Sequence, residues 1–226
     1  MTDTSDAIRE RRSIRRYLPT PVPADVVAEI LTEARWAPSA GNTQSTEVFV
    51  VTGDALDRVK TTLRERAESE AEPAPDIAGA SYPEHLQQRM TALFKARSAF
   101  VAATEEKMGV KPADPPVPLG VVMAGLFGAP VLLLLATDTA VGVPYGCFDA
   151  GLFAQTIALA AHNRGLGTCI MTSTLRSADA LHHVLPEAEG KTFIAAITLG
   201  HPDPNAPVNQ FPRQRVTLDD FVTRVE

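Results

Sequence analysis

Pro130-Val131-Leu132-Leu133-Leu134-Leu135-Ala136 is an unbroken apolar run that opens on a proline. A strand with this pattern is apolar on both of its faces, so it belongs in the centre of a sheet that is covered on both sides. The run is far shorter than the roughly 20 residues that a membrane-spanning helix needs. It therefore predicts a buried central strand in a sheet with helices packed above and below.

Three other segments carry strand-like patterning, and the remaining apolar periodicity is helical. Strands are predicted at Glu47 to Val51, Gly167 to Thr172 and Thr192 to Leu199. The pattern predicts an α+β fold with helices on both faces of one sheet. Residues from about 54 to 127 form a helical excursion within a single domain of residues 1–226. Helices are predicted at about 4–11, 26–34, 54–70, 84–108, 149–163 and 177–185, with a final helix or arm from residue 218.

The composition limits what the protein binds and where it works. The 226 residues are 45% hydrophobic and 21% charged, which is typical of an ordered globular domain. The net charge of −6 argues against nucleic acid as a partner, because phosphate backbones need a basic surface. Residues 1–16 contain no apolar segment typical of a secretory signal. Cys147 and Cys169 lack CxxC spacing and are expected to be reduced thiols, so a cytoplasmic protein is expected.

Two arginine clusters are the first candidates for a ligand site. Arg11-Arg12-Ser13-Ile14-Arg15-Arg16 follows the first predicted helix, and Arg213-Gln214-Arg215 follows the last predicted strand. Guanidinium groups donate paired hydrogen bonds that suit phosphate or carbonyl edges. On composition alone, a solvated charged face balanced by nearby acids is the simpler explanation of the first cluster. Ordinary surface arginines would explain the second.

A turn-like stretch, Pro38-Ser39-Ala40-Gly41-Asn42-Thr43-Gln44, is the third candidate. A proline-stiffened turn with amide and hydroxyl side chains can hold a planar polar heterocycle, although an ordinary helix-to-strand turn has the same composition.

Motifs for other chemistries are missing: no GxGxxG follows a strand, no P-loop occurs, and no GxSxG elbow surrounds a serine. His182 and His183 have no third ligand at a recognisable spacing, so no metal site is expected.

Taken in order, six motifs resemble those of the FMN-dependent nitroreductase family, and the match runs across most of the chain. The tail from Asp203 to Asn209, with Arg215 and the segment 218–222, resembles the nitrobenzoate-reductase branch. The resemblance implies a nitroreductase-like fold with a mainly antiparallel central sheet flanked by helices. The six motifs are Arg11-Arg12-Ser13-x-Arg15, Ala37-Pro38-Ser39-x-Gly41-Asn42-x-Gln44, Gly128-Ala129-Pro130, Asp149-x-Gly151, Gly165-Leu166-Gly167-Thr168-Cys169 and Leu199-Gly200-His201-Pro202.

The resemblance also implies a cofactor and roles for the clusters. FMN is expected at the interface of a homodimer, where the arginine-rich motif reaches the flavin from one subunit and the 38–44 motif reaches it from the other. Thr172 and Ser173 stand where the family often has a Gly-Gly pair close to flavin N5. The implied cofactor-binding residues are Arg11, Arg12, Ser13, Arg15, Pro38, Ser39, Asn42, Gln44, Thr172, Ser173, Arg213 and Arg215.

The implied activity is a ping-pong reduction of a small molecule. NAD(P)H gives a hydride to flavin N5 and leaves, and a nitroaromatic or quinone-like acceptor then takes the electrons. Because the flavin carries the chemistry, no catalytic side chain is expected. Neither nucleic acid nor a membrane is an expected partner. Aromatic residues of the excursion are candidates for the substrate wall, or else ordinary core: Tyr82, Phe94, Phe100 and Phe127.

Departures from the family pattern leave other functions open. Gln44 is followed by Ser45-Thr46 where the family usually has Pro-Trp, and the segment Val121 to Phe127 is apolar where the branch is often polar or basic. A flavoenzyme that acts on an enone or a biosynthetic intermediate is one alternative. A non-enzymatic flavin-binding protein and a helical interaction protein without a cofactor are the others.

Overall fold

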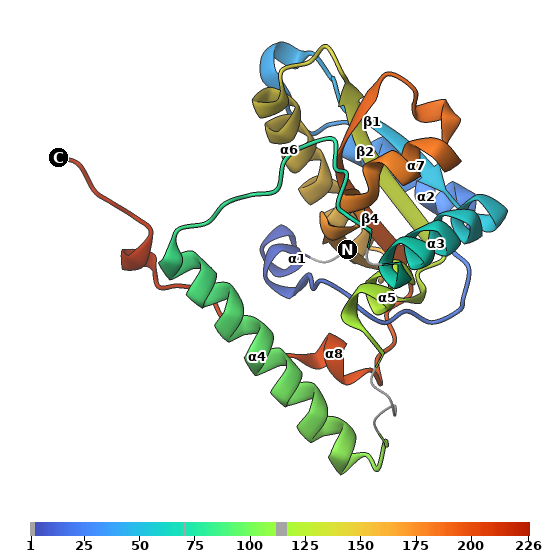
Figure 1. Ribbon diagram of the computed structural model, residues 1–226. Coiled ribbons are helices and arrows are strands. Elements are labelled where there is room, and N and C mark those ends of the chain that lie inside the picture. Colours follow the sequence, from blue (N-terminus) through green and yellow to red (C-terminus); the bar gives the residue numbers. More distant parts are fainter. Residues whose placement is uncertain (1–2, 70, 112–116) are drawn as a thin grey trace.

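The computed structural model describes residues 3–69, 71–111 and 117–226, so residues 112–116 of the expected excursion lie outside the description. At its centre is a four-stranded sheet of β1 (Glu47–Val51), β2 (Val131–Asp138), β3 (Gly167–Met171) and β4 (Lys191–Gly200). The strand order is β1-β2-β4-β3, and each neighbouring pair is antiparallel (Figure 1). The expected antiparallel sheet is confirmed.

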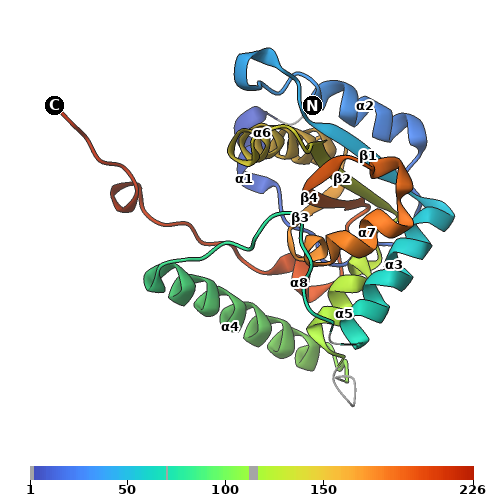
Figure 2. The ribbon, with the colours of Figure 1, turned by 45° about the horizontal axis from the view of Figure 1, so that its top comes forward.

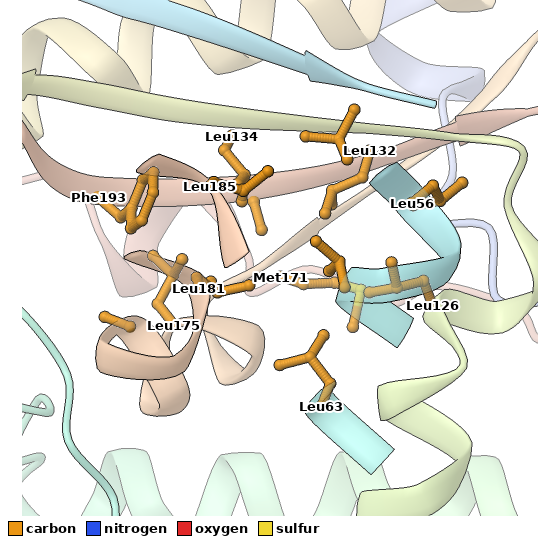
Figure 3. Packing of buried hydrophobic residues seen from close by; sticks show 14 of the residues in the cluster. Leu56, Leu63, Leu126, Leu132, Leu134, Met171, Leu175, Leu181, Leu185 and Phe193 are labelled. Atoms are coloured by element: carbon orange, nitrogen blue, oxygen red, sulfur yellow. The ribbon is translucent and has the colours of Figure 1, made fainter. Parts of the chain in front are cut away.

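The apolar run of β2 separates two layers of side chains. Leu132 and Leu134 point into the cluster shown in Figure 3, which also contains residues of α3 (Gly53–Glu68), α5 (Leu119–Ala124) and α7 (Ala178–Val184). The alternate residues Leu133 and Leu135 join a second cluster with α2 (Ala24–Ala34) and α6 (Val143–His162). Full burial of a leucine contributes roughly 1.5–3 kcal/mol. Helices therefore cover both faces of the sheet, as the run predicts.

The remaining elements are short, apart from one long helix. They are α1 (Thr4–Glu10), α4 (Glu84–Lys107), α8 (Pro207–Gln210), and the 3-10 turns η1 (Ala40–Asn42), η2 (Leu126–Gly128), η3 (Ser173–Ser177), η4 (Pro186–Ala188) and η5 (Leu218–Asp220). None of the helices in the described part of the chain is long and apolar enough to cross a membrane.

The helical excursion is narrower than the sequence indicates. Leu56, Val59 and Leu63 of α3 are buried in the core, so this helix belongs to the body of the domain. In contrast, no residue of α4 is buried. Figures 1 and 2 show α4 standing clear of the sheet, with α8 between them. The part of the chain that departs from the body therefore begins after α3.

Most boundaries agree with the predicted ones to within two residues, and two differ by more. Helix α6 starts at Val143 and not at Asp149, because Pro144 occupies the first helical turn, where its missing N–H costs nothing. Only the short turn η5 forms within the predicted final helix or arm, and the chain then runs out extended to residue 226 (Figure 2).

Candidate functional site

The segment 11–18 lies along the end of β3 as a further, strand-like arm. Ile14 donates its N–H to the Thr168 carbonyl (2.9 Å), and Leu18 donates to the His201 carbonyl (2.9 Å). Ile14 and Tyr17 are buried together against Ala129. Because these two apolar side chains face inward, the arginines between and before them are left half-buried or exposed at the edge of the sheet.

The arm can lie this close only because residue 167 is glycine. A Cβ on Gly167 would lie 2.4 Å from Ile14 Cγ1 and 2.9 Å from Pro202 Cγ. We therefore expect Gly167→Ala to lower the free energy of unfolding in urea by about 1–3 kcal/mol, the usual effect of overpacking. Gly151→Ala is the matched control, because a Cβ there meets nothing within 4 Å. A similar loss at both positions would contradict this account.

The two arginine clusters meet at this arm. The Arg213 guanidinium donates to the Arg11 carbonyl. Burial lowers the pKa of Arg11, and the nearby charge of Arg215 lowers it further. The Nε of Arg11 is buried and has no hydrogen-bond partner within the described residues. Among the ion pairs of residues 3–69, 71–111 and 117–226, none neutralises Arg11, Arg12, Arg15, Arg213 or Arg215.

One asparagine joins the arm to the C-terminal segment. The Asn209 side-chain oxygen accepts the Arg15 N–H (2.8 Å), and its amide group donates to the carbonyls of Arg16 (2.8 Å) and Asp203 (3.0 Å). The side chain thus satisfies three backbone groups from two distant segments. It holds the two arginine clusters in one place, a role that the sequence analysis did not assign.

The structure adds a further arginine that sequence reasoning missed. Arg97 of α4 is half-buried, and this partial burial and then the charge of Arg15 lower its pKa, so it approaches the same cluster. Helix α4 is brought there by Phe100, which packs edge-on against Phe211 with ring centroids 5.6 Å apart. No motif surrounds Arg97 in the sequence, and its position depends on how α4 docks.

The predicted 38–44 motif lies elsewhere, as a strained loop. Gly41, Asn42 and Gln44 all have positive φ, at 57°, 56° and 51°. The Ser39 hydroxyl accepts the Gln44 N–H (2.9 Å) and closes the loop, while the side chains of Asn42 and Gln44 are exposed. Pro38 is exposed as well. The loop therefore presents two amide side chains outward in a fixed backbone conformation.

The loop and the arginine clusters lie at opposite ends of α6 in one chain (Figure 1). The Asp149 carboxylate on α6 accepts the N–H of loop residue Ala40 (3.0 Å). Near the end of the same helix, His162 and Arg11 line one small cavity. Residues 149 to 162 of a helix span roughly 20 Å, at about 1.5 Å per residue. A single chain does not bring the two predicted groups together.

Thr172 and Ser173 lie where β3 ends and η3 begins. Thr172 is exposed, and Ser173 lines a cavity of about 550 Å³. Thr174 lines the same cavity and is itself buried, and its hydroxyl has no partner within the described residues. The rest of the lining is mixed: it includes the apolar residues Leu63, Ala67, Leu119, Met123 and Ala124 and the charged residues Arg66, Glu72 and Arg176.

The four aromatic residues predicted for the substrate wall are not gathered in one place. Tyr82 and Phe94 are 48% and 47% exposed, and Phe100 packs against Phe211. Phe127 is half-buried against Tyr17 and the core. None of the four is among the residues that line the cavity beside Ser173.

His182, one of the two adjacent histidines, contacts a carboxylate. His182 Nε2 lies 2.9 Å from the Asp76 carboxylate, which also accepts the Phe193 N–H (2.8 Å). Within the described ranges, no group of three or more His, Cys, Asp or Glu side chains is placed to hold a metal ion. His182 thus helps to fix the connection after α3 to the edge of β4.

The antiparallel sheet has helices on both faces, and at its edge lies an arginine cluster that no ion pair of the described residues neutralises; these features define a class of protein, an α+β protein with a cationic site beside its sheet. Comparison with known proteins then identifies the family. The model of the nitroreductase family matches residues 8–201, and the chain belongs to that family.

Relatives match along nearly their whole length. The chain is 30% identical to nitrobenzene nitroreductase of Ectopseudomonas oleovorans, covering 97% of this chain and 96% of the relative. It is 32% identical to 4-nitrobenzoate reductase of Pseudomonas putida, covering 98% and 95%. The crystal structure of the FMN-dependent nitroreductase NfnB from Mycobacterium smegmatis in complex with NADPH is similar, with a TM-score of 0.82, 25% identity and coverage of 98% and 97%.

Proposed function

We propose that this chain is an FMN-dependent oxidoreductase that uses NADH or NADPH to reduce nitroaromatic or quinone-like acceptors, and that it works as a homodimer in the cytoplasm. The observation that carries the proposal is an arginine cluster that no ion pair of the described residues neutralises, in a chain that belongs to the nitroreductase family. When bound, FMN supplies the two-electron chemistry, by accepting a hydride from the nicotinamide and passing electrons to the acceptor. The two free cysteines agree with a reducing compartment.

The arginine cluster fits the phosphate of FMN. Several guanidinium groups lie close together. Burial is the main cause that lowers the pKa of Arg11 and Arg213, and the like charges of the neighbouring arginines lower it further. An anion would relieve this repulsion and would give the orphaned Arg11 Nε a partner. Arg11, Arg12, Ser13, Arg15, Arg213 and Arg215 would hold the cofactor, with the cationic groups of the arm stabilising negative charge on it.

A second copy of the chain would complete the site. Because the 38–44 loop and the arginine cluster lie at opposite ends of α6, only the loop of a partner subunit would reach the arginines. The surface agrees with such a partner: Met90, Leu93 and Phe94 of α4 are exposed, as are Phe221 and Val225 of the C-terminal arm. Exposed apolar side chains in this number favour burial in an interface.

The cavity beside Ser173 is the place that we assign to the electron acceptor. Its walls include the apolar side chains of Leu63, Leu119 and Met123, against which an aromatic ring can pack. The unpaired Thr174 hydroxyl offers a donor for an oxygen of the acceptor, and a nitro group or a quinone presents such oxygens. Thr172 and Ser173 would lie between this cavity and the flavin. The substrate roles of Tyr82, Phe94, Phe100 and Phe127 stay predictions, because a partner subunit would rearrange what each of them contacts.

The visible spectrum of the purified protein, before and after anaerobic addition of NADPH, tests the proposal. We expect a flavin spectrum that NADPH bleaches and that a nitroaromatic compound restores. Bleaching followed by reoxidation with an enone, but not with a nitroaromatic compound, would point to a flavoenzyme with another substrate. A flavin that neither NADPH nor NADH bleaches would identify a flavin-binding protein that is no reductase. A colourless protein that FMN cannot reconstitute would overturn the proposal.

A further inference from the structure

Asp149 is a buried carboxylate that holds two separate points of the 38–45 segment. It lies on α6 and is only 3% exposed. One oxygen accepts the Ala40 N–H (3.0 Å), and the other accepts the Ser45 hydroxyl (3.2 Å). No cation pairs with it among the ion pairs of the described residues. Burying a carboxylate without a counter-ion costs free energy, so we expect Asp149 to have a specific role at this position.

The end of β2 adds a third attachment for the same segment. The Thr137 hydroxyl donates to the Ser45 carbonyl (3.2 Å). Helix α6 approaches β2 closely at this point, since a Cβ on Gly146 would lie 3.0 Å from the Thr137 Cγ2. Ser45 is therefore fixed through its hydroxyl by the helix and through its carbonyl by the strand. The rigid core supplies both attachments.

The residues of the loop with positive φ lie between these attachment points. Gly41, Asn42 and Gln44, with their positive φ, fall between Ala40 and Ser45. Asparagine and glutamine adopt this conformation at a cost, and such strain persists only where the surroundings enforce it. Asp149 accepts hydrogen bonds from Ala40 and Ser45, which lie on either side of these residues. The exposed amide side chains of Asn42 and Gln44 are left free of the core.

We propose that Asp149 is a positioning residue of the cofactor site: it holds the 40–45 loop in its ligand-binding conformation before the cofactor arrives. This inference rests on the proposed function, in which Asn42 and Gln44 contact the flavin held by the partner subunit. A loop that is already ordered loses less conformational freedom on binding, so the affinity is higher. Without Asp149 the loop would relax, and the cofactor would have to order it.

The test compares variants of the full-length protein after FMN has been removed. Asp149→Ala removes both acceptors, and we expect the dissociation constant for FMN to rise about tenfold or more, which corresponds to about 1.4 kcal/mol. Asp149→Asn keeps an acceptor for the Ala40 N–H, and its amide group can donate to the Ser45 hydroxyl, which also accepts. We therefore expect Asp149→Asn to restore most of the affinity.

Amide hydrogen exchange in the cofactor-free protein gives a readout that does not depend on FMN. We expect protected amides at residues 40–45 in the natural protein and loss of that protection in Asp149→Ala. Asp76→Ala is the matched control, because Asp76 also accepts a backbone N–H and binds a side chain, but in the connection after α3. It should leave both the FMN affinity and the exchange at 40–45 unchanged.

The FMN affinities and the exchange rates together decide whether Asp149 is a positioning residue. An Asp149→Ala protein with natural FMN affinity and natural exchange at 40–45 would overturn the inference, as would an equal loss of FMN affinity in Asp76→Ala. Should Asp149→Ala fail to fold, Ser45→Ala, which removes one of the two contacts, takes its place with an expected weakening of about threefold. If the natural protein does not bind FMN at all, the proposed function fails, and the exchange data alone then decide whether Asp149 fixes the loop.

Discussion

Replacing Arg11 and Arg215 together by alanine is expected to remove FMN from the purified protein while leaving a folded dimer. A hydrogen bond to a charged group contributes about 1.5–3 kcal/mol, so the loss of two such partners of a phosphate should weaken binding by roughly 10²- to 10⁴-fold. The flavin absorbance per subunit after gel filtration measures the loss. Arg9→Ala with Arg16→Ala is the matched control, because both arginines are exposed and neither is among the residues expected to hold the cofactor.

The same double variant should not lose stability when the cofactor is absent. The pKa of Arg11 is lowered in the folded chain, first by burial and then by Arg215. A base with a lowered pKa destabilises the folded state at every pH at which it stays charged there, which includes neutral pH. Thermal unfolding of the cofactor-free proteins should therefore give the variant a melting temperature equal to or above that of the natural chain. Unchanged FMN content in a folded Arg11→Ala, Arg215→Ala dimer would refute the assignment of these arginines.

Mixing two inactive variants is expected to restore part of the flavin binding. One variant carries Arg11→Ala and Arg215→Ala, and the other carries Asn42→Ala and Gln44→Ala. If each site takes its arginines from one subunit and its loop from the other, a mixed dimer contains one intact site and one doubly damaged site. Equal random mixing then makes about a quarter of all sites intact in a symmetric dimer. Two different affinity tags isolate the mixed dimer for the measurement of bound FMN.

The control for this experiment uses two variants of the same half-site. Arg12→Ala with Arg213→Ala, mixed with the Arg11→Ala, Arg215→Ala protein, should restore nothing, because no subunit then has an intact arginine cluster. A purified mixed dimer of arginine and loop variants that binds no FMN would contradict a site shared between subunits. Recovery in the same-half control would contradict it as well.

Much of the fold could be predicted because buried strands and helix faces carry apolar residues in regular patterns along the sequence. The strand at 47–51 has the predicted bounds, and the apolar run that forms β2 is buried on both sides as expected. The start of α6 was missed because Gly142 and Pro144 are typical of a turn, although a proline also suits the first turn of a helix. Local composition is ambiguous at such points, and packing decides between the two.

The site could be predicted only where motifs mark it. Arg11, Arg213 and Arg215 were singled out by the sequence, and the structure brings their segments together. Arg97 was missed because no motif surrounds it and nothing in the sequence indicates where α4 docks. Asp149 stood in a motif without a role, because its contacts with Ala40 and Ser45 join parts of the chain that are far apart in sequence.

In the proposed dimer, each chain gives its 38–44 loop to one FMN site and its arginine cluster to the other, and α6 joins the two. The length of α6 is therefore constrained during evolution. One residue inserted between Asp149 and His162 would turn one end of the helix by about 100° relative to the other and lengthen it by about 1.5 Å. The loop would then lose its attachment, or the arginine arm its support. Descendants of this chain must therefore keep the number of residues in α6 between Asp149 and His162.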